Sequence, residues 1–480
     1  MTTFVREISD GAGAKAESLS VAFIIAVVLA AAMGGMMFGW DWVVIGGAKP
    51  FFERFFDISS NPTLSGWANS CALLGCFVGA AVGGPISDRY GRKRPLIAAA
   101  LIFAVTSVGN ALAQSFTGFV AWRLAGGVAI GLASGLSPLY IAEIAPARMR
   151  GRLVALNQLT IVIGVLGAQL VNWWIVRDLP ANSTDEFIAS SWYGHSAWRW
   201  MFGVLLIPSA LFLVGMLMVP ESPRWLIKNG RIGEAKRILA RIGGADYAES
   251  AASDIQASGL LSAAKVRISE LFAPGVKRAL LIGVVIAIFQ QWCGINVIFN
   301  YAEEIFRAAG FDISNVVSNI AWTGSVNLVF TIVALNLVDS VGRKPLMLIG
   351  AAGLAAIYTA VGVCFALGVT GFPVLLLVLA AIGCYGMTLA PVTWIVISEI
   401  FPTRLRGAAM SIAVGALWLA CFALTYTFPL LNAKLGAAGV FYLYAIVCVS
   451  GLLFIWKFLG ETKGKTLEQL ERDLGAGQSD

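Results

Sequence analysis

The sequence predicts an all-α integral membrane protein with twelve membrane-spanning helices in two pseudo-symmetric bundles of six. Of its 480 residues, 58% are hydrophobic and only 13% are charged, and the mean hydropathy is +0.80. A spanning helix needs about 20 consecutive apolar residues, and runs of that length recur along nearly the whole chain. A membrane β-barrel would instead show alternating segments of about ten residues. The third observation is an internal repeat, in which two charged motifs occur once in each half of the chain.

The charged residues fall mainly between the apolar runs and therefore set the span boundaries. In the first half we predict spans at residues 19–48, 64–86, 95–113, 117–143, 153–176 and 198–219. In the second half we predict spans at residues 279–301, 315–338, 345–368, 372–398, 407–430 and 437–458. The 52 glycines are consistent with close packing between such helices.

Two charged motifs occur once in each half of the chain. Residues 88–95 read DRYGRKRP and residues 339–345 read DSVGRKP, each between the second and third spans of its half. Residues 143–151 read EIAPARMRG and residues 399–407 read EIFPTRLRG. A period of roughly 250 residues indicates two fused homologous bundles rather than a solenoid. We therefore predict bundles at residues 1–219 and 279–458, a linker at residues 220–278 and a tail at residues 459–480.

The linker is the one long hydrophilic stretch. Its residues 231–242 place apolar side chains on one helical face, which predicts short amphipathic helices beneath the bundles. The stretch is too short for a catalytic domain, and no nucleophile and base pair or metal-ligand grouping occurs in the spans. We therefore expect no enzyme activity and no cofactor. The seven cysteines all lie in predicted spans, which favours a packing role over disulfides.

Lysine and arginine are distributed unevenly between the two ends of the predicted spans. The linker and the loops on its side hold most of them, whereas the opposite loops hold only Lys49, Arg54, Arg177, Arg199, Arg307 and Lys434. The positive-inside rule then places the linker and both termini in the cytoplasm. The net charge of +7 reflects this anchoring at an anionic lipid surface and predicts no nucleic-acid partner.

Four groups of residues together carry a family resemblance. They are Gly84 with Asp88, Arg89, Gly91, Arg92 and Lys93; PESPR at 220–224; Gln290 and Gln291 with Gly294 and Asn296; and ETKG at 461–464. With these motifs the chain resembles the sugar porter family of the major facilitator superfamily over essentially its whole length, with bacterial xylose-proton symporters nearest in appearance. The resemblance implies the major facilitator fold, alternating access, a monomer and a bacterial inner membrane.

Among the polar residues within predicted spans, Asp41 is the strongest candidate for a functional role. A carboxylate in that position costs about 2.5–3.5 kcal/mol on insertion scales, so it needs a partner, a cavity or a proton. Arg123, early in the fourth span, is the partner that the resemblance places beside it. Burial disfavours the charged carboxylate and the arginine favours it, so movement of Arg123 would switch Asp41 between proton-binding and proton-releasing states. A purely structural pair in a passive carrier is the alternative.

A sugar needs amide partners for its hydroxyl groups and an aromatic face for its C–H surface. The resemblance places candidate residues for both at a central cavity: Gln158, Gln290, Gln291, Asn296, Asn327, Trp394 and Phe38. An amide at such a position can also serve only to join helices. The chain departs from the family pattern at Val165, Leu417 and Cys421, where amides are common, so one flank of the site has lost hydroxyl partners.

The repeated charged residues on the linker side could pair with one another and so hold the two halves together as a latch. The resemblance implies these members: Asp88, Arg92, Glu143, Arg150, Glu221, Arg224, Arg343, Glu399 and Arg406. Exposed pairs contribute only about 0–1 kcal/mol each, so a network of them could bias one state and still break in each cycle. These residues could alternatively serve only topology and helix ends.

We thus predict a proton-coupled monosaccharide symporter for a pentose, hexose or polyol, with a sugar and a proton as partners and lipid as its surroundings. A passive sugar facilitator is the leading alternative. A sugar sensor that binds without transporting ranks lower, because such proteins tend to carry long signalling tails, and here about 20 residues follow the last span.

Overall fold

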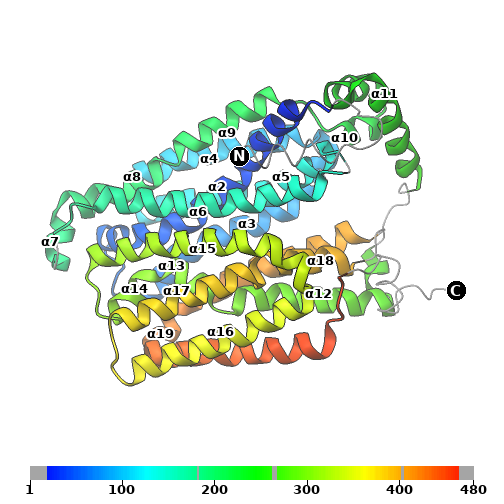
Figure 1. The fold of residues 1–480 in the computed structure, drawn as a ribbon. Helices are drawn as coiled ribbons and strands as arrows, with labels where there is room; N and C mark the ends of the chain where they lie inside the picture. Colours follow the sequence, from blue (N-terminus) through cyan, green and yellow to red (C-terminus); the bar gives the residue numbers. More distant parts are fainter. Residues whose placement is uncertain (1–18, 147, 181–182, 262–267, 402–404, 464–480) are drawn as a thin grey trace.

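A computed structural model describes residues 19–146, 148–180, 183–261, 268–401 and 405–463. Two helical bundles lie side by side (Figure 1). The N-terminal bundle contains α2 (Val21–Phe55), α3 (Pro62–Tyr90), α4 (Lys93–Leu112), α5 (Phe116–Ile144), α6 (Arg150–Val176), α7 (Asp185–Ser190), a π-helix (Tyr193–Ala197), α8 (Trp198–Gly203) and α9 (Leu206–Met218). Two helices, α10 (Pro223–Lys228) and α11 (Ile232–Leu261), follow in the linker.

The C-terminal bundle begins after a 3₁₀ turn (Ile268–Phe272). It contains α12 (Pro274–Trp292), α13 (Ile295–Asn300), α14 (Ala302–Ala308), α15 (Ile313–Val341), α16 (Arg343–Ala366), α17 (Phe372–Met387), α18 (Leu389–Ile400) and α19 (Arg406–Phe458). In the described part of the chain, eleven helical segments are long and apolar enough to cross a membrane. The last has 53 residues and a non-helical Gly436 (φ 67°), so it turns back and supplies two spans, giving the predicted twelve.

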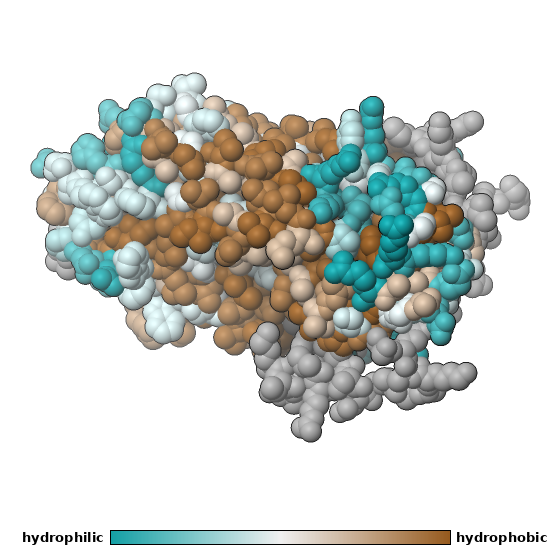
Figure 2. Space-filling model, turned by 90° about the horizontal axis from the view of Figure 1, so that it is seen from above, coloured by the Kyte–Doolittle hydropathy of each residue, from teal (hydrophilic) through white to brown (hydrophobic). Residues whose placement is uncertain are grey.

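We call the end of the molecule that carries α10 and α11 the linker end, and the end that carries α7 and α14 the α7 end (Figure 1). A broad hydrophobic surface lies between hydrophilic surfaces at the two ends (Figure 2). This is the pattern expected of a protein surrounded by lipid along its middle. In the linker helix α11, Ala235, Leu239 and Ile242 are buried, as the amphipathic pattern predicts.

One predicted span ends too early, and two others span the membrane as predicted but contain a break in the helix. The first predicted span ends at residue 48, but α2 continues to Phe55 with Pro50 inside it. The predicted helix over 279–301 breaks at Gly294, which has a left-handed backbone (φ 89°). The predicted helix over 372–398 breaks at Thr388 (φ −121°, ψ −84°), so that Pro391 lies in the first turn of α18, where its missing N–H costs little. Hydropathy continues through both breaks and does not reveal them.

The two bundles touch through α3 against α19 and α6 against α15. Gly66 of α3 packs on the backbone of Tyr426, and Gln169 of α6 donates a hydrogen bond to the Thr323 hydroxyl at 3.1 Å. These contacts lie in the part of the helices nearer the α7 end. The two bundles are therefore held together there in this structure.

Candidate functional site

Asp41 and Arg123 form a buried ion pair in the middle of the N-terminal bundle. Nη1 of Arg123 lies 2.8 Å and 3.0 Å from the two carboxylate oxygens of Asp41, and each residue is 2% exposed. Arg123 also lies over the ring of Phe202, 5.3 Å from its centroid. Removing water from two charges is expensive, and mutual pairing with good geometry offsets that cost. The pair that the sequence predicts is formed.

Three predicted amides form a hydrogen-bonded chain in the C-terminal bundle. Nε2 of Gln291 donates to Oε1 of Gln290 at 2.6 Å, and the Asn296 amide donates to Oε1 of Gln291. Gln290 in turn donates to the hydroxyl of Tyr385 on α17 at 3.0 Å. The break at Gly294 makes this possible, because the left-handed residue turns the backbone between α12 and α13 and brings Asn296 back onto Gln291. Amides that both donate and accept are suited to a polyhydroxyl ligand.

An aromatic cluster joins the two bundles beside these polar groups. Phe38 and Trp42 lie one helical turn apart on α2, and both rings contact Trp418 of α19, with centroid distances of 5.7 Å. Phe38 is half-buried, whereas Trp418 is 1% exposed. Phe38 and Trp42 stand on either side of Asp41 in the sequence of α2, so the ion pair and the aromatic surface are adjacent.

The structure brings together some of the predicted binding residues and not others. Gln158 and Trp394 are half-buried on α6 and α18, and the Asn327 amide lies against Gly386 of α17. Among the described residues, none of these three hydrogen-bonds to the Gln290, Gln291 and Asn296 chain. Sequence reasoning missed Tyr385 and Trp418, since a single tyrosine or tryptophan in an apolar span carries no distinguishing pattern. Cys421, predicted as a departure, lies 3.6 Å from the Asn296 amide nitrogen.

At the linker end, Arg92 is the centre of a charged network in the N-terminal bundle. Its guanidinium donates two hydrogen bonds to Glu143, at 2.8 Å and 2.9 Å, and lies 3.4 Å from Asp88. The Ser222 hydroxyl donates to Glu143 at 2.5 Å. Glu221 accepts from the backbone N–H groups of Arg92 and Lys93 and so caps the start of α4.

The C-terminal bundle repeats this arrangement. Arg343 lies 3.3 Å from Glu399, and the Thr462 hydroxyl donates to Glu399 at 2.6 Å. Glu461 accepts from the backbone N–H groups of Arg343 and Lys344, each at 3.1 Å, at the start of α16. Burial would raise the pKa of Glu461, but hydrogen bonds from the backbone N–H groups of Lys463, Arg343, Lys344 and Thr462 outweigh it and lower the pKa.

Glu461 is absent from the predicted network. The signal that could have found it is the Glu-Ser pair at 221–222 and the Glu-Thr pair at 461–462, each directly after the last span of its half. Of the remaining predicted members, Arg224 is exposed at the surface, and partial removal from water together with the like charge of Arg150 lowers its pKa. Arg406 donates to the carbonyl of Phe401 at 3.4 Å. In the part of the chain that the structure describes, every ion pair of this network lies within one bundle.

Gly91→Ala is expected to destabilise the protein by about 1–3 kcal/mol. Gly91 has φ +89°, and an added methyl group would collide with the carboxylate of Glu221. Thermal unfolding in detergent measures the effect. Gly84→Ala is the matched control, because Gly84 is helical and an added methyl group there meets nothing within 4 Å. Equal melting temperatures for the two variants would contradict the role assigned to this turn.

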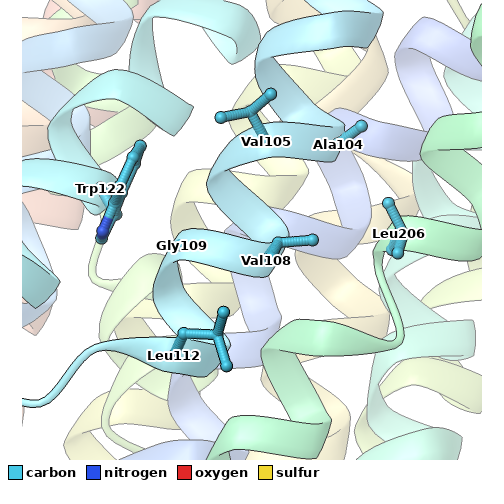
Figure 3. A pocket seen from close by; sticks show the side chains of 7 residues that line it. All are labelled: Ala104, Val105, Val108, Gly109, Leu112, Trp122 and Leu206. Atoms are coloured by element: carbon cyan, nitrogen blue, oxygen red, sulfur yellow. The ribbon is translucent and has the colours of Figure 1, made fainter.

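An open groove elsewhere on the molecule is lined by apolar side chains and holds no amide or charged group like those of the candidate site. It has a volume of about 510 Å³ and lies between α4, α5 and α9, lined by Val105, Val108, Leu112, Trp122 and Leu206 with Ala104 and Gly109 (Figure 3). These side chains lie on the part of the surface that would face lipid. Among the described residues no group of histidine, cysteine, aspartate and glutamate side chains could hold a metal ion.

The chain is similar to known transporters over nearly its whole length. The family model for "Sugar (and other) transporter" matches residues 27–474. The D-xylose-proton symporter of Escherichia coli K12 is 38% identical over 482 residues, which cover 94% of this chain and 95% of that protein. The arabinose-proton symporter of Bacillus subtilis is 37% identical, covering 95% of this chain and 96% of that protein.

Solved structures show the same fold. The inward-open conformation of the xylose transporter XylE from E. coli matches with a TM-score of 0.81 and 37% identity, over 94% of this chain and 99% of that one. Its partially occluded inward-open conformation matches with a TM-score of 0.80 and 35% identity, over 93% of this chain and 100% of that one. The family and these relatives are transporters rather than enzymes. The chain belongs to the sugar porter family of the major facilitator superfamily.

Proposed function

We propose that this protein is a monosaccharide symporter that couples the movement of a pentose, hexose or polyol to a proton by alternating access. The observation that carries the proposal is the buried Asp41–Arg123 pair, whose Asp41 lies on the same helix as Phe38 of the aromatic cluster at the junction of the two bundles. Relatives named as xylose-proton and arabinose-proton symporters support it.

In the proposed mechanism Asp41 carries the proton. In this structure Asp41 is paired with Arg123 and sealed from water. When Arg123 moves away, the carboxylate loses its counter-charge in a dry site, and taking up a proton is then its least costly state. Return of Arg123 expels the proton. The transport step is thereby linked to titration of Asp41.

The sugar site is proposed to form between the two bundles. Gln290, Gln291 and Asn296 would exchange their mutual hydrogen bonds for bonds to sugar hydroxyls, and Phe38 would supply an apolar face. Gln158, Asn327 and Trp394 remain proposed members on the facing helices. Breaking an amide–amide bond as a sugar bond forms keeps every buried polar group paired, so binding carries a small polar desolvation cost.

The charged network at the linker end is proposed to act in alternating access. We expect Glu399→Gln to weaken the bonds that Arg343 and Thr462 make to this side chain and to favour the state that is open at the linker end. The rate at which cysteines introduced at the linker end react with a water-soluble thiol reagent measures this opening, and it should rise in Glu399→Gln. Asp246→Asn, at an exposed carboxylate of the linker helix α11, is a control at the same end. Unchanged reactivity in Glu399→Gln would contradict the role.

We propose that the linker end faces the cytoplasm of a bacterial cell, with the protein in the inner membrane and both termini inside. The excess of lysine and arginine at this end supports that orientation. We further propose that the protein works as a monomer with lipid around it.

Uptake into membrane vesicles with and without a proton gradient tests the proposal. A symporter accumulates its sugar only while the gradient is present, and an uncoupler abolishes accumulation without abolishing exchange. Identical final sugar levels with and without the gradient would make the protein a passive facilitator.

A further inference from the structure

At the α7 end, charged side chains lie buried between the two bundles. Nζ of Lys49 on α2 lies 2.9 Å from Glu53, 2.5 Å from Glu304 and 3.8 Å from Glu303. The side chains of Lys49, Glu53 and Glu303 are 5–7% exposed, and that of Glu304 is 26% exposed. We call Lys49, Glu53, Glu303 and Glu304 the Lys49 cluster. From the sequence, Lys49 is expected in a loop, and these four residues carry no predicted role.

The cluster connects one bundle to the other. Lys49 and Glu53 belong to α2 of the N-terminal bundle, whereas Glu303 and Glu304 belong to α14 of the C-terminal bundle. At its edge, Arg54 of α2 lies 3.6 Å from Glu303, and Arg307 of α14 lies 3.7 Å from Asp185 of α7. The ion pairs of the linker-end network lie within single bundles, so the described cross-bundle ion pairs gather at the α7 end. They can exist only while the bundles are closed at that end.

The charges in the cluster do not balance. Three carboxylates, of Glu53, Glu303 and Glu304, surround the single ammonium group of Lys49. Arg54 and Arg307 both contact Glu303, at 3.6 Å and 3.4 Å, but each also pairs with Asp185, so the three cations face four carboxylates. Glu53 is further satisfied by the Ser65 hydroxyl at 2.6 Å. Oε2 of Glu304, in contrast, is buried without a hydrogen-bond partner among the described residues. A surplus negative charge removed from water is costly. Protonation of Glu304 would therefore lower the free energy of the cluster more than protonation of Glu53 or Glu303.

The other groups that face Glu304 do not supply the missing charge. From α19, Phe428 and Asn432 border the small cavity beside Glu304, and both are uncharged. Tyr301 donates its hydroxyl to the carbonyl of Thr425 at 2.6 Å. Burial, together with the negative charges of Glu303 and Glu53, outweighs the attraction of Lys49 and raises the pKa of Glu304 to about 7.

We propose that the Lys49 cluster is a proton-sensitive latch that holds the α7 end closed, with Glu304 as the group that binds the proton. The latch is separate from Asp41 and does not depend on which solute is carried. Opening the α7 end breaks the pairs of Lys49 with Glu303 and Glu304 and of Arg54 with Glu303, and it returns Glu304 to water.

The direction of the pH effect follows from linkage. Glu304 has a pKa of about 7 when the end is closed and an ordinary value of 4.5 when it is exposed. The closed state therefore binds the proton more tightly than the open state. The resulting stabilisation of the closed state is fully present below pH 4.5 and is lost as the pH rises through about 7. Acidification on the α7 side closes that side.

The test measures the distance between spin labels on the full-length protein in nanodiscs, at pH 5 to 8. The labels are attached to cysteines introduced at Ser59 and Ala308, which are exposed at the α7 end of opposite bundles, after the seven native cysteines are replaced by alanine. In the protein with an unchanged Lys49 cluster, the fraction of molecules with the short label-to-label distance is expected to fall as the pH rises through about 7. Glu304→Gln mimics the protonated side chain and is expected to stay closed at every pH.

Lys49→Met removes the central cation and is expected to shift most molecules to the long distance, whereas Lys49→Arg keeps the charge and is expected to stay closed. Glu186→Gln, an exposed carboxylate on α7, is the matched control and is expected to match the unmodified latch. A closed Lys49→Met protein would overturn the latch. A pH response retained in Glu304→Gln, or lost in Glu186→Gln, would overturn the assignment of the proton to Glu304.

Discussion

Asp41→Asn is expected to abolish uphill sugar uptake and to leave exchange of sugar across the membrane intact. One proton crossing 100 mV supplies about 2.3 kcal/mol, which sustains roughly fifty-fold accumulation of a neutral solute. An asparagine in this position cannot carry the proton, so the accumulation ratio should fall to about one. Its side-chain oxygen can still accept a hydrogen bond from Arg123, so the fold and the sugar site should persist. Uptake and exchange of labelled sugar in energised vesicles measure both quantities.

The matched control for this change is Asp178→Asn. Asp178 is an exposed aspartate at the α7 end, with its side chain 81% exposed, and it pairs with the neighbouring Arg177. This variant should accumulate sugar as the unmodified protein does. Accumulation retained in Asp41→Asn would remove the proton role from Asp41 and leave the pair with Arg123 as a structural feature.

Gln291→Ala is expected to weaken sugar binding by roughly 10- to 100-fold. Gln291 is the middle member of the amide chain, so its loss removes a partner from both Gln290 and Asn296 and a bond to the sugar. A buried polar group left without a partner costs about 1–3 kcal/mol, and each 1.4 kcal/mol is tenfold in affinity. Ligand-induced quenching of tryptophan fluorescence, which Trp418 and Trp42 should report, measures the dissociation constant.

The control for Gln291→Ala is Gln114→Ala, because Gln114 is an exposed glutamine in a loop far from the amide chain. It is expected to bind sugar with unchanged affinity. Unchanged affinity in Gln291→Ala would instead show that the amide chain serves only to join α12, α13 and α17.

Hydropathy and the internal repeat were sufficient to predict the fold. Twelve apolar stretches separated by charges define twelve spans, because lipid leaves the backbone no alternative to continuous helices. The breaks at Gly294 and Thr388 could not be predicted in this way, since both lie inside apolar sequence. The first break shapes the amide chain, so part of the candidate site depends on a feature that composition does not reveal.

The extension of α2 to Phe55 was missed for a different reason. Lys49, Glu53 and Arg54 look like loop residues, because charged side chains normally mark the end of a span. In the folded protein they lie against α14 of the other bundle, which supplies their counter-charges. A contact between residues some 250 positions apart has no signature in local sequence.

The Asp41–Arg123 pair could be predicted because a charge inside a span needs a partner, and few candidates exist. Arg92, Glu143, Arg343 and Glu399 of the linker-end network could also be predicted, because their motifs occur twice, whereas Glu461 was missed. Which member pairs with which could not, since the same residues could connect within a bundle or between bundles.

Sugar-driven proton movement tests the central claim most directly. Pentoses, hexoses and inositols are added in turn to weakly buffered, energy-depleted cells that contain the protein, and the external pH is recorded. The proposed symport predicts external alkalinisation with at least one of these compounds, and its loss in Asp41→Asn. Entry of the sugar without any change in pH would contradict proton coupling and make the protein a facilitator.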